Sequence, residues 1–169
     1  ERHHGVKNPT FKDVKDYYDK YLHPDSIDLN DQNVYKNIFH KGKFVGTFQF
    51  TNSGAQRLAK RAKPTDIIDI SAITSIYRPG PLSAGVDKSY VKAKKESEGV
   101  RYLNDIVEEV TKETAGFLIF QEQIALLAHK LGKDITLEEG NKLRKLLTKK
   151  GTGKGAEEKI DIMNRFVAG

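Results

Sequence analysis

The sequence predicts an all-α fold with at most a short β-hairpin. Apolar residues recur every three or four positions along most of the 169 residues, which is the period of an amphipathic helix. Helix-start signals stand in front of two such segments, because Thr10 precedes Asp13 and Thr136 precedes Glu139 at the spacing of a capping box. No segment alternates strongly between apolar and polar residues, and no internal repeat appears.

The chain divides into a series of expected helices. A first helix over 11–22 is followed by a polar linker over 23–31, whose aspartates lack the glycine and the final glutamate of a calcium loop. Asp31 begins a second helix, and "FVGTFQF" at 44–50 is expected to be a short strand or a buried link. Later helices are expected over 54–62, 66–77 (with Thr65 as its cap), 82–95, 102–114, 117–131, 137–150 and 158–169.

Composition favours an anionic partner. The formal charge is +6, the pI is near 9.3, and 31% of the residues are charged. No apolar run is long enough to cross a membrane, so we expect a cytoplasmic protein with no membrane partner. The absence of cysteine excludes disulfides. The first residue is Glu1 and the single methionine is Met163, so we expect the sequence to be a piece of a longer chain.

Four residues, Arg78-Pro79-Gly80-Pro81, form a stiff turn between two expected helices. The prolines fix φ, Pro79 moves Arg78 out of helical geometry, and Gly80 tolerates unusual backbone angles. From the residues alone, this turn is either a rigid corner between helices or a place that holds Arg78 for a partner.

Positive charge is arranged in rows on three of the expected helices. The rows are Arg57, Lys60 and Arg61; Lys88, Lys92 and Lys95; and Lys142, Lys145 and Lys149. Each row by itself is compatible with an ordinary solvated surface, but three rows with few nearby acids favour a polyanion site. Arg144 departs from its row and lies at the border of the apolar face, where its guanidinium is better held.

A polar triplet, Gln121-Glu122-Gln123, interrupts an apolar segment, so part of it is expected to be buried and hydrogen-bonded. Glu122 is a candidate to anchor an arginine such as Arg78 or Arg144. The residues offer no catalytic group and no metal-ligand spacing, and "GTGKG" at 151–155 fails the pattern of a phosphate-binding loop.

Four blocks of this chain resemble the fingers region of the bacterial (C-family) DNA polymerase III alpha subunit. They are "GTFQFTNSGAQRL" at 46–58, "YRPGPLSAG" at 77–85, "ETAGFLIFQEQIALLAHKL" at 113–131 and "LRKLLTKK" at 143–150. The resemblance covers residues 29–169, which gives a fingers-like helical domain after an N-terminal helix and linker over 1–28. Ala115 and Phe120 stand where the family has tyrosine, Thr51 where it often has glutamate, and Lys145 where it has arginine, as in a divergent bacterial or viral member.

The resemblance implies a part of a replicative DNA polymerase whose partners are a DNA primer-template, a dNTP, and the palm and thumb domains. It implies that the complete enzyme uses Mg²⁺ held by palm carboxylates, whereas this segment binds no cofactor or metal, supplies no catalytic residue and is inactive alone. The implied nucleotide-binding residues are Arg144, Lys145, Lys149, Lys150 and Arg78. DNA binding is expected from Arg57, Lys60, Arg61, Lys88 and Lys92, and a structural role from Pro79, Gly80, Pro81, Gln121, Glu122 and Gln123.

Two other classes stay open at this point. One is a non-catalytic helical module that binds nucleic acid, and the other is a helical protein-interaction domain.

Overall fold

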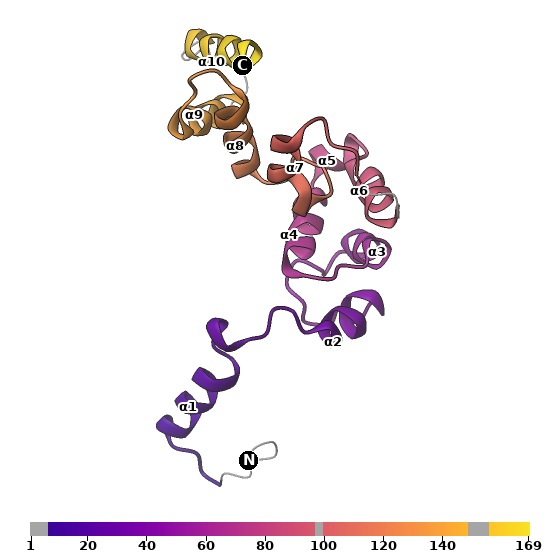
Figure 1. Cartoon of the computed structure of the whole chain (residues 1–169). Helices are drawn as coiled ribbons and strands as arrows, with labels where there is room; N and C mark the ends of the chain where they lie inside the picture. The colour runs from indigo at the N-terminus through magenta and orange to yellow at the C-terminus, as the bar shows by residue number, and fades with distance from the viewer. Residues whose placement is uncertain (1–6, 97–99, 149–155) are drawn as a thin grey trace.

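The protein is all-α in the computed structural model, which describes residues 7–96, 100–148 and 156–169. This confirms the predicted fold class, and no strand occurs within those ranges. The α-helices, drawn in Figure 1, are α1 (Phe11–Tyr21), α2 (Gln32–Val34), α3 (Ser53–Ala62), α4 (Ile67–Ile76), α5 (Pro79–Ser83), α6 (Val86–Lys95), α7 (Asp105–Thr111), α8 (Gln121–Leu131), α9 (Leu137–Thr148) and α10 (Ala156–Ala168). Shorter pieces are the 3₁₀ turns η1 (Pro24–Ser26) and η3 (Lys112–Thr114) and the π-helical segment η2 (Tyr35–His40).

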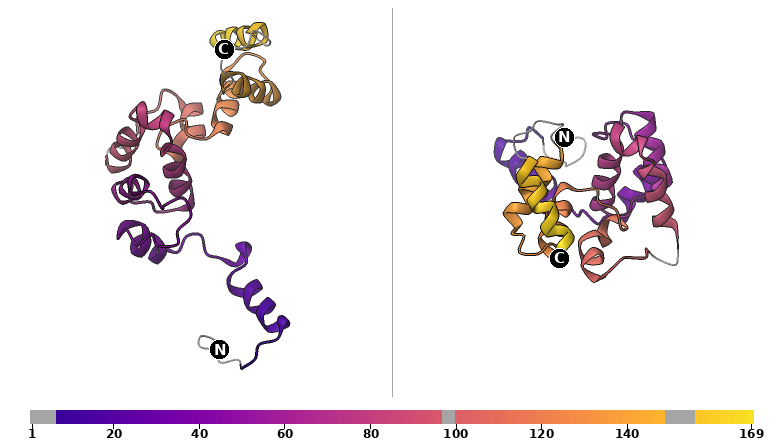
Figure 2. Two further views of the ribbon diagram at one scale, coloured as in Figure 1. Left: turned by 180° about the vertical axis from the view of Figure 1, so that it is seen from behind. Right: turned by 90° about the horizontal axis from the view of Figure 1, so that it is seen from above.

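The N-terminal helix α1 extends away from the other helices in Figures 1 and 2. Its start is the predicted capping box: the Asp13 amide donates to Thr10 Oγ1 at 3.3 Å, and the Thr10 amide donates to Asp13 Oδ2 at 2.8 Å. All residues of α1 are described and none of them is buried. Local capping and helical spacing, rather than a core, therefore account for this helix.

The larger core lies among η2, α3, α4 and α6. Aromatic rings from η2 and the following loop fill one side, and the rings of Phe39 and Phe50 meet edge to face with centroids 5.4 Å apart. On the other side, α3 buries small apolar residues every three or four positions, including Ala55 and Ala59. These small side chains allow α3 to approach α4 and α6 closely.

The chain turns between α4 and α6 as predicted, but the expected turn residues Pro79, Gly80 and Pro81 lie in the short helix α5, and Gly80 does not take a positive φ. Arg78 is extended, with φ −134° and ψ 153°, and stands just before α5, whose first residue is Pro79. Gly85 then takes φ +70°, a left-handed angle that favours glycine, before α6 begins. The predicted continuous helix over 82–95 is therefore wrong, because the chain turns at Gly85.

A second, smaller core lies between α8, α9 and α10 and contains Ala128, Ile135, Leu143 and Ile162. Gly140 makes the α8–α9 contact possible, because a Cβ atom there would lie 2.5 Å from the Ala125 carbonyl oxygen. The predicted capping box at the start of α9 is confirmed: the Thr136 amide donates to Glu139 Oε2 at 2.9 Å. Figures 1 and 2 place α8–α10 at one end of the molecule and α1 at the other.

Two local predictions are wrong. Asp66, not Thr65, caps α4: the Asp69 amide donates to Asp66 Oδ1 at 2.7 Å, while Thr65 itself donates to the Asp69 carboxylate. Residues 117–120 are not helical, since α8 begins at Gln121 and two left-handed residues, Ala115 and Gly116, turn the chain just before them. Of the two alternatives predicted for residues 44–50, the strand is absent, and the segment forms a link of turns between the buried Phe44 and Phe50.

Candidate nucleic-acid interface

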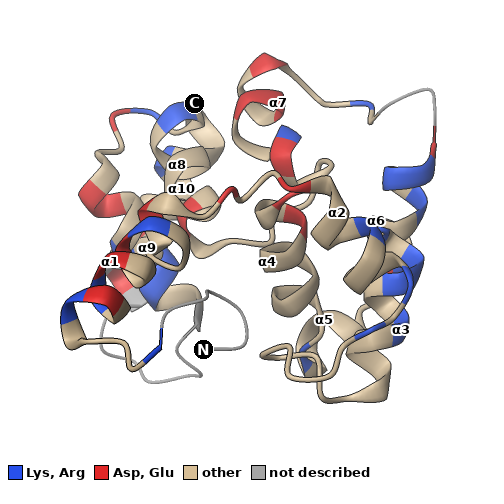
Figure 3. Ribbon diagram, turned by 90° about the horizontal axis from the view of Figure 1, so that it is seen from below, with Lys and Arg blue, Asp and Glu red and all other residues tan. Residues whose placement is uncertain are grey.

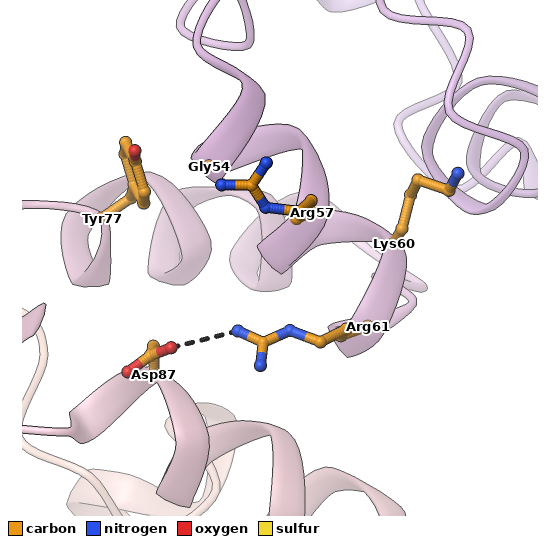
Figure 4. Close-up of a pocket in the computed structure, with 6 residues that line it drawn as sticks. All are labelled: Gly54, Arg57, Lys60, Arg61, Tyr77 and Asp87. Carbon is orange, nitrogen blue, oxygen red and sulfur yellow. Dashed lines mark hydrogen bonds and ion pairs between the residues drawn. The ribbon is translucent and has the colours of Figure 1, made fainter.

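The cations of α3 line a hollow of about 550 Å³ on the surface. Helical spacing brings Arg57, Lys60 and Arg61 to one face of α3, and the corner after α4 brings Tyr77 to the same place (Figure 4). Asp87 of α6 closes the opposite wall and accepts from Arg61 Nη2 at 3.0 Å. Three cations against one carboxylate leave this hollow positively charged.

The exposed cations of α6 extend the same charged region, because α6 packs against α3. Figure 3 shows Lys and Arg gathered on these two helices. Lys88, Lys92 and Lys95 are exposed, as their spacing predicted, and Lys92 pairs with Glu96 at 3.4 Å across one helical turn. The partly buried Lys94, in contrast, turns inward to the carboxylate of Asp69.

The corner residue Arg78 is exposed and lines a second hollow, of about 400 Å³. Phe48, Phe50 and Thr74 also line it, and so does Tyr77, which belongs to both hollows. Within the described residues, Arg78 forms no ion pair. The structure thus keeps the charge of Arg78 on the surface beside aromatic rings.

Arg144 lies on α9 at the edge of the smaller core, where its side chain is half-buried. Its guanidinium donates to the side-chain oxygen of Gln121 at the start of α8. Lys145 is exposed on the next position, and Lys142 pairs with Glu138 at 3.6 Å on the same helix. Lys149 and Lys150 lie outside the described residues.

The three residues of the polar triplet at the start of α8 have different roles. Gln123 is buried: its Oε1 accepts from the amides of Ile119 and Phe120 at 2.8 and 2.9 Å, and its Nε2 donates to Thr114 Oγ1 at 2.7 Å. Glu122 is exposed and forms no ion pair with a described residue. The predicted Glu122–arginine pair is therefore wrong, because its neighbour Gln121 contacts Arg144 instead.

Two residues that line the first hollow, Tyr77 and Asp87, were not predicted from the sequence. The spacing of α3 identified its cations, but Tyr77 and Asp87 come from other elements and join it only through the tertiary fold. A signal for Tyr77 was present, since it directly precedes the rigid Arg78-Pro79 corner. No helix in the described part of the chain is long and apolar enough to cross a membrane.

A helical fold with cationic surfaces is typical of nucleic-acid-binding modules. Comparison with known proteins identifies the particular family: the sequence profile of the bacterial DNA polymerase III alpha subunit finger domain matches residues 7–168. The chain therefore belongs to this family, as the resemblance of its motifs indicated.

Individual relatives agree with this assignment. The chain is 36% identical to the DNA polymerase III subunit alpha of Aquifex aeolicus and 35% identical to that of Chlamydia trachomatis serovar D, over 85% of this chain in both cases. It is 33% identical to the protein of the same name from Campylobacter jejuni over 93% of this chain. The aligned residues cover only 11–13% of these relatives, so the chain corresponds to a small part of their length.

Proposed function

We propose that this chain is the fingers segment of a replicative DNA polymerase that carries out template-directed nucleotidyl transfer. The match of the finger-domain profile over residues 7–168 carries the proposal. In this role the segment contacts the incoming dNTP and the DNA, and it works together with palm and thumb domains of the complete enzyme.

The triphosphate contact is assigned to α9. Arg144 and Lys145 stand side by side there, and we assign Lys149 and Lys150, further along the chain, to the same phosphates. A triphosphate gains negative charge on its leaving group during transfer, and cations held on a rigid helix stabilise that charge. Support for Arg144 comes from its hydrogen bond to Gln121, which fixes the direction of the guanidinium.

The contact with the DNA backbone is assigned to α3 and α6. Arg57 and Lys60 form no ion pair with a described residue, and Lys88 is exposed on α6, so phosphate oxygens are natural partners for all three. Lys92 and Arg61 already have carboxylate partners, at Glu96 and Asp87, and a phosphate would add to or replace those pairs. The resulting contacts are electrostatic and independent of DNA sequence.

Arg78 is assigned to a different phosphate from that of Arg144. Helix α5, which begins directly after Arg78, lies apart from α9 in Figures 1 and 3. Arg78 instead faces the hollow that it shares with Tyr77.

Magnesium chemistry is not assigned to the described residues. Among them, no group of three or more His, Asp or Glu side chains is placed to hold a metal ion. We therefore propose that the metal ligands come from elsewhere in the complete enzyme, and that this chain alone does not extend a primer.

A DNA-binding titration of this chain tests the proposal. Affinity for duplex DNA should fall steeply with salt, because each lysine–phosphate contact releases counterions. Replacing Lys88 and Lys92 together by alanine should reduce the slope of log K against log salt by about 2. No primer extension should occur when Mg²⁺ and dNTPs are added.

Two results would contradict the proposal. Primer extension by the purified chain would place the catalytic residues within it. DNA affinity that does not change with salt, or no DNA binding at all, would favour the protein-interaction domain.

A further inference from the structure

Two neighbouring hollows on the surface share one wall, the side chain of Tyr77. The first, of about 550 Å³, contains Tyr77 with Arg57, and the second, of about 400 Å³, contains Phe48 with Arg78. Each hollow therefore combines aromatic and cationic side chains. This combination is typical of proteins that bind single-stranded nucleic acid, where rings stack on bases and cations contact phosphates.

Phe48 is an aromatic side chain held in water, with 84% of its surface exposed. The chain around it is well anchored, because Phe44 and Phe50 are buried in the larger core. Between these anchors Gly46 and Gln49 take positive φ angles of 77° and 68°, and the non-glycine angle at Gln49 is unusual. The Phe48 ring is therefore held at the surface between two buried anchors and next to a left-handed residue.

Tyr77 is fixed in place before any ligand arrives. The Tyr77 hydroxyl donates to Asn52 Oδ1 at 2.7 Å. Asn52 Oδ1 also accepts a hydrogen bond from the Gly54 amide at 2.8 Å. The ring lies directly over Gly54, where a Cβ atom would be only 2.1 Å from the hydroxyl oxygen. A ring that is already held in position loses little entropy when it binds, which favours its use as a stacking surface.

The charges around the two rings suit a phosphate backbone. Arg57 lies beside Tyr77 in Figure 4, and its guanidinium donates a long hydrogen bond of 3.5 Å to Ser53 Oγ. Arg78 and Lys60 are exposed and form no ion pair within the described part of the chain. The side chain of Lys60 lies over Gly42 and points away from Tyr77 in Figure 4.

We propose that these two hollows form a track for single-stranded DNA, with unpaired bases on Tyr77 and Phe48 and phosphates on Arg57 and Arg78. Paired bases are already stacked inside a duplex and cannot use the rings in this way. The inference rests on the proposed function in one respect, that this face binds DNA, and it adds which form of DNA the face selects.

Binding measurements on four variants of the full chain test the track. Fluorescence anisotropy would compare a labelled oligothymidylate with a blunt duplex of the same length. Phe48→Ala and Tyr77→Ala should each weaken single-strand binding about tenfold, because stacking contributes about 1–3 kcal/mol per base, and should leave duplex binding unchanged. Tyr77→Phe, which keeps the ring, should bind nearly as well as the parent chain.

The matched control is Phe11→Ala. Phe11 is 85% exposed, like Phe48, but lies on α1, away from both hollows, so its removal should change neither affinity. Because the Phe48 side chain is mostly exposed, Phe48→Ala should not unfold the chain. This variant therefore tests binding even if Tyr77→Ala unfolds. An oligonucleotide with 5-iododeoxyuridine, irradiated on the unmodified chain, should cross-link to Tyr77 or Phe48.

The outcomes separate the track from the proposed function. Equal losses for single strand and duplex, or no loss on Phe48→Ala, would overturn the track while leaving backbone binding by α3 and α6 in place. Such a result would instead indicate that Phe48 packs against another protein domain. A parent chain that binds neither form of DNA would overturn both proposals.

Discussion

Asp69 is the buried carboxylate around which α4 and α6 are joined. Burial by itself raises the pKa of Asp69, but Lys94, the Thr65 amide and the Tyr90 hydroxyl outweigh this effect and hold the pKa below its usual value. The Tyr90 hydroxyl donates to Asp69 Oδ1 at 3.0 Å, and burial raises the pKa of Tyr90 well above its usual value. Asp69 is therefore charged at neutral pH and depends on Lys94 for compensation.

Lys94→Ala should destabilise the fold by about 3 kcal/mol, because it leaves the charge of Asp69 buried without its cation. Urea unfolding followed by circular dichroism measures this change. The control on the same helix is Lys92→Ala, whose pair with Glu96 is exposed, and which should cost about 0.5 kcal/mol or less. Equal effects of the two substitutions would show that Asp69 does not need Lys94.

At the scale of elements, Gly54 of α3 allows Tyr77, at the end of α4, to pack closely against α3. Gly54→Ala should push the Tyr77 ring away and break its hydrogen bond to Asn52, at a cost of about 1–3 kcal/mol, although alanine normally favours a helix. Gly80→Ala is the matched control on α5, since a Cβ there meets no atom within 4 Å, and should stabilise by up to about 1 kcal/mol. Thermal unfolding of both variants checks the prediction, and stabilisation by Gly54→Ala would contradict the position of Tyr77.

Helices α9 and α10 are joined by one arginine. Arg165 Nη2 donates to Glu139 Oε1 at 2.6 Å, and Arg165 Nη1 donates to the Asp134 carbonyl at 3.0 Å. The bond from Arg165, together with the capping bonds of Thr136, lowers the pKa of Glu139 from 4.5 to about 2. Since Glu139 lies in the first turn of α9, this contact fixes the position of α10 relative to the helix that carries Arg144.

The lowered pKa of Glu139 predicts how stability depends on pH. Between pH 4.5 and about 2 the unfolded chain binds a proton at Glu139 and the folded chain does not, so folding is favoured above this window and loses that contribution as the pH falls through it. The melting temperature should therefore fall over this window, and Glu139→Gln should reduce that fall. An unchanged pH dependence in the variant would show that the Arg165 contact contributes nothing in solution.

At the scale of the whole molecule, the sequence predicted most features that depend on residues three or four apart, but it missed several helix boundaries and the contacts between distant segments. Both capping boxes and the cationic face of α3 depend on residues three or four apart, so spacing alone predicts them. The hollow beside Tyr77 depends on the turn after α4 and on α6, which spacing cannot place. Thr65 and Asp66 are both good capping residues, so the local sequence does not decide between them. In the structure Thr65 donates hydrogen bonds to the buried Asp69 carboxylate, and Asp66 caps the helix instead.

The polar triplet at the start of α8 illustrates the same limit. Its position between apolar runs predicted that part of it would be buried, but not which part. Helix α8 begins at Gln121, and the phase of the helix then turns Gln123 inward and leaves Glu122 in solvent. The start of the helix is set by the left-handed turn at residues 115–116, whose first residue is an alanine and gives no local signal.

The assignment of the triphosphate to α9 is the central claim, and single-turnover incorporation of a dNTP by a complete polymerase carrying this segment tests it most directly. Arg144→Ala should lower incorporation efficiency about ten- to a hundredfold, because it removes one or two charge-assisted bonds of about 1.5–3 kcal/mol each. DNA affinity should change much less, since α3 and α6 supply most of that binding. Lys142→Ala, on the same helix and paired with Glu138, should leave incorporation nearly unchanged. Equal effects of the two substitutions, or a loss of DNA binding with normal incorporation in Arg144→Ala, would contradict the claim.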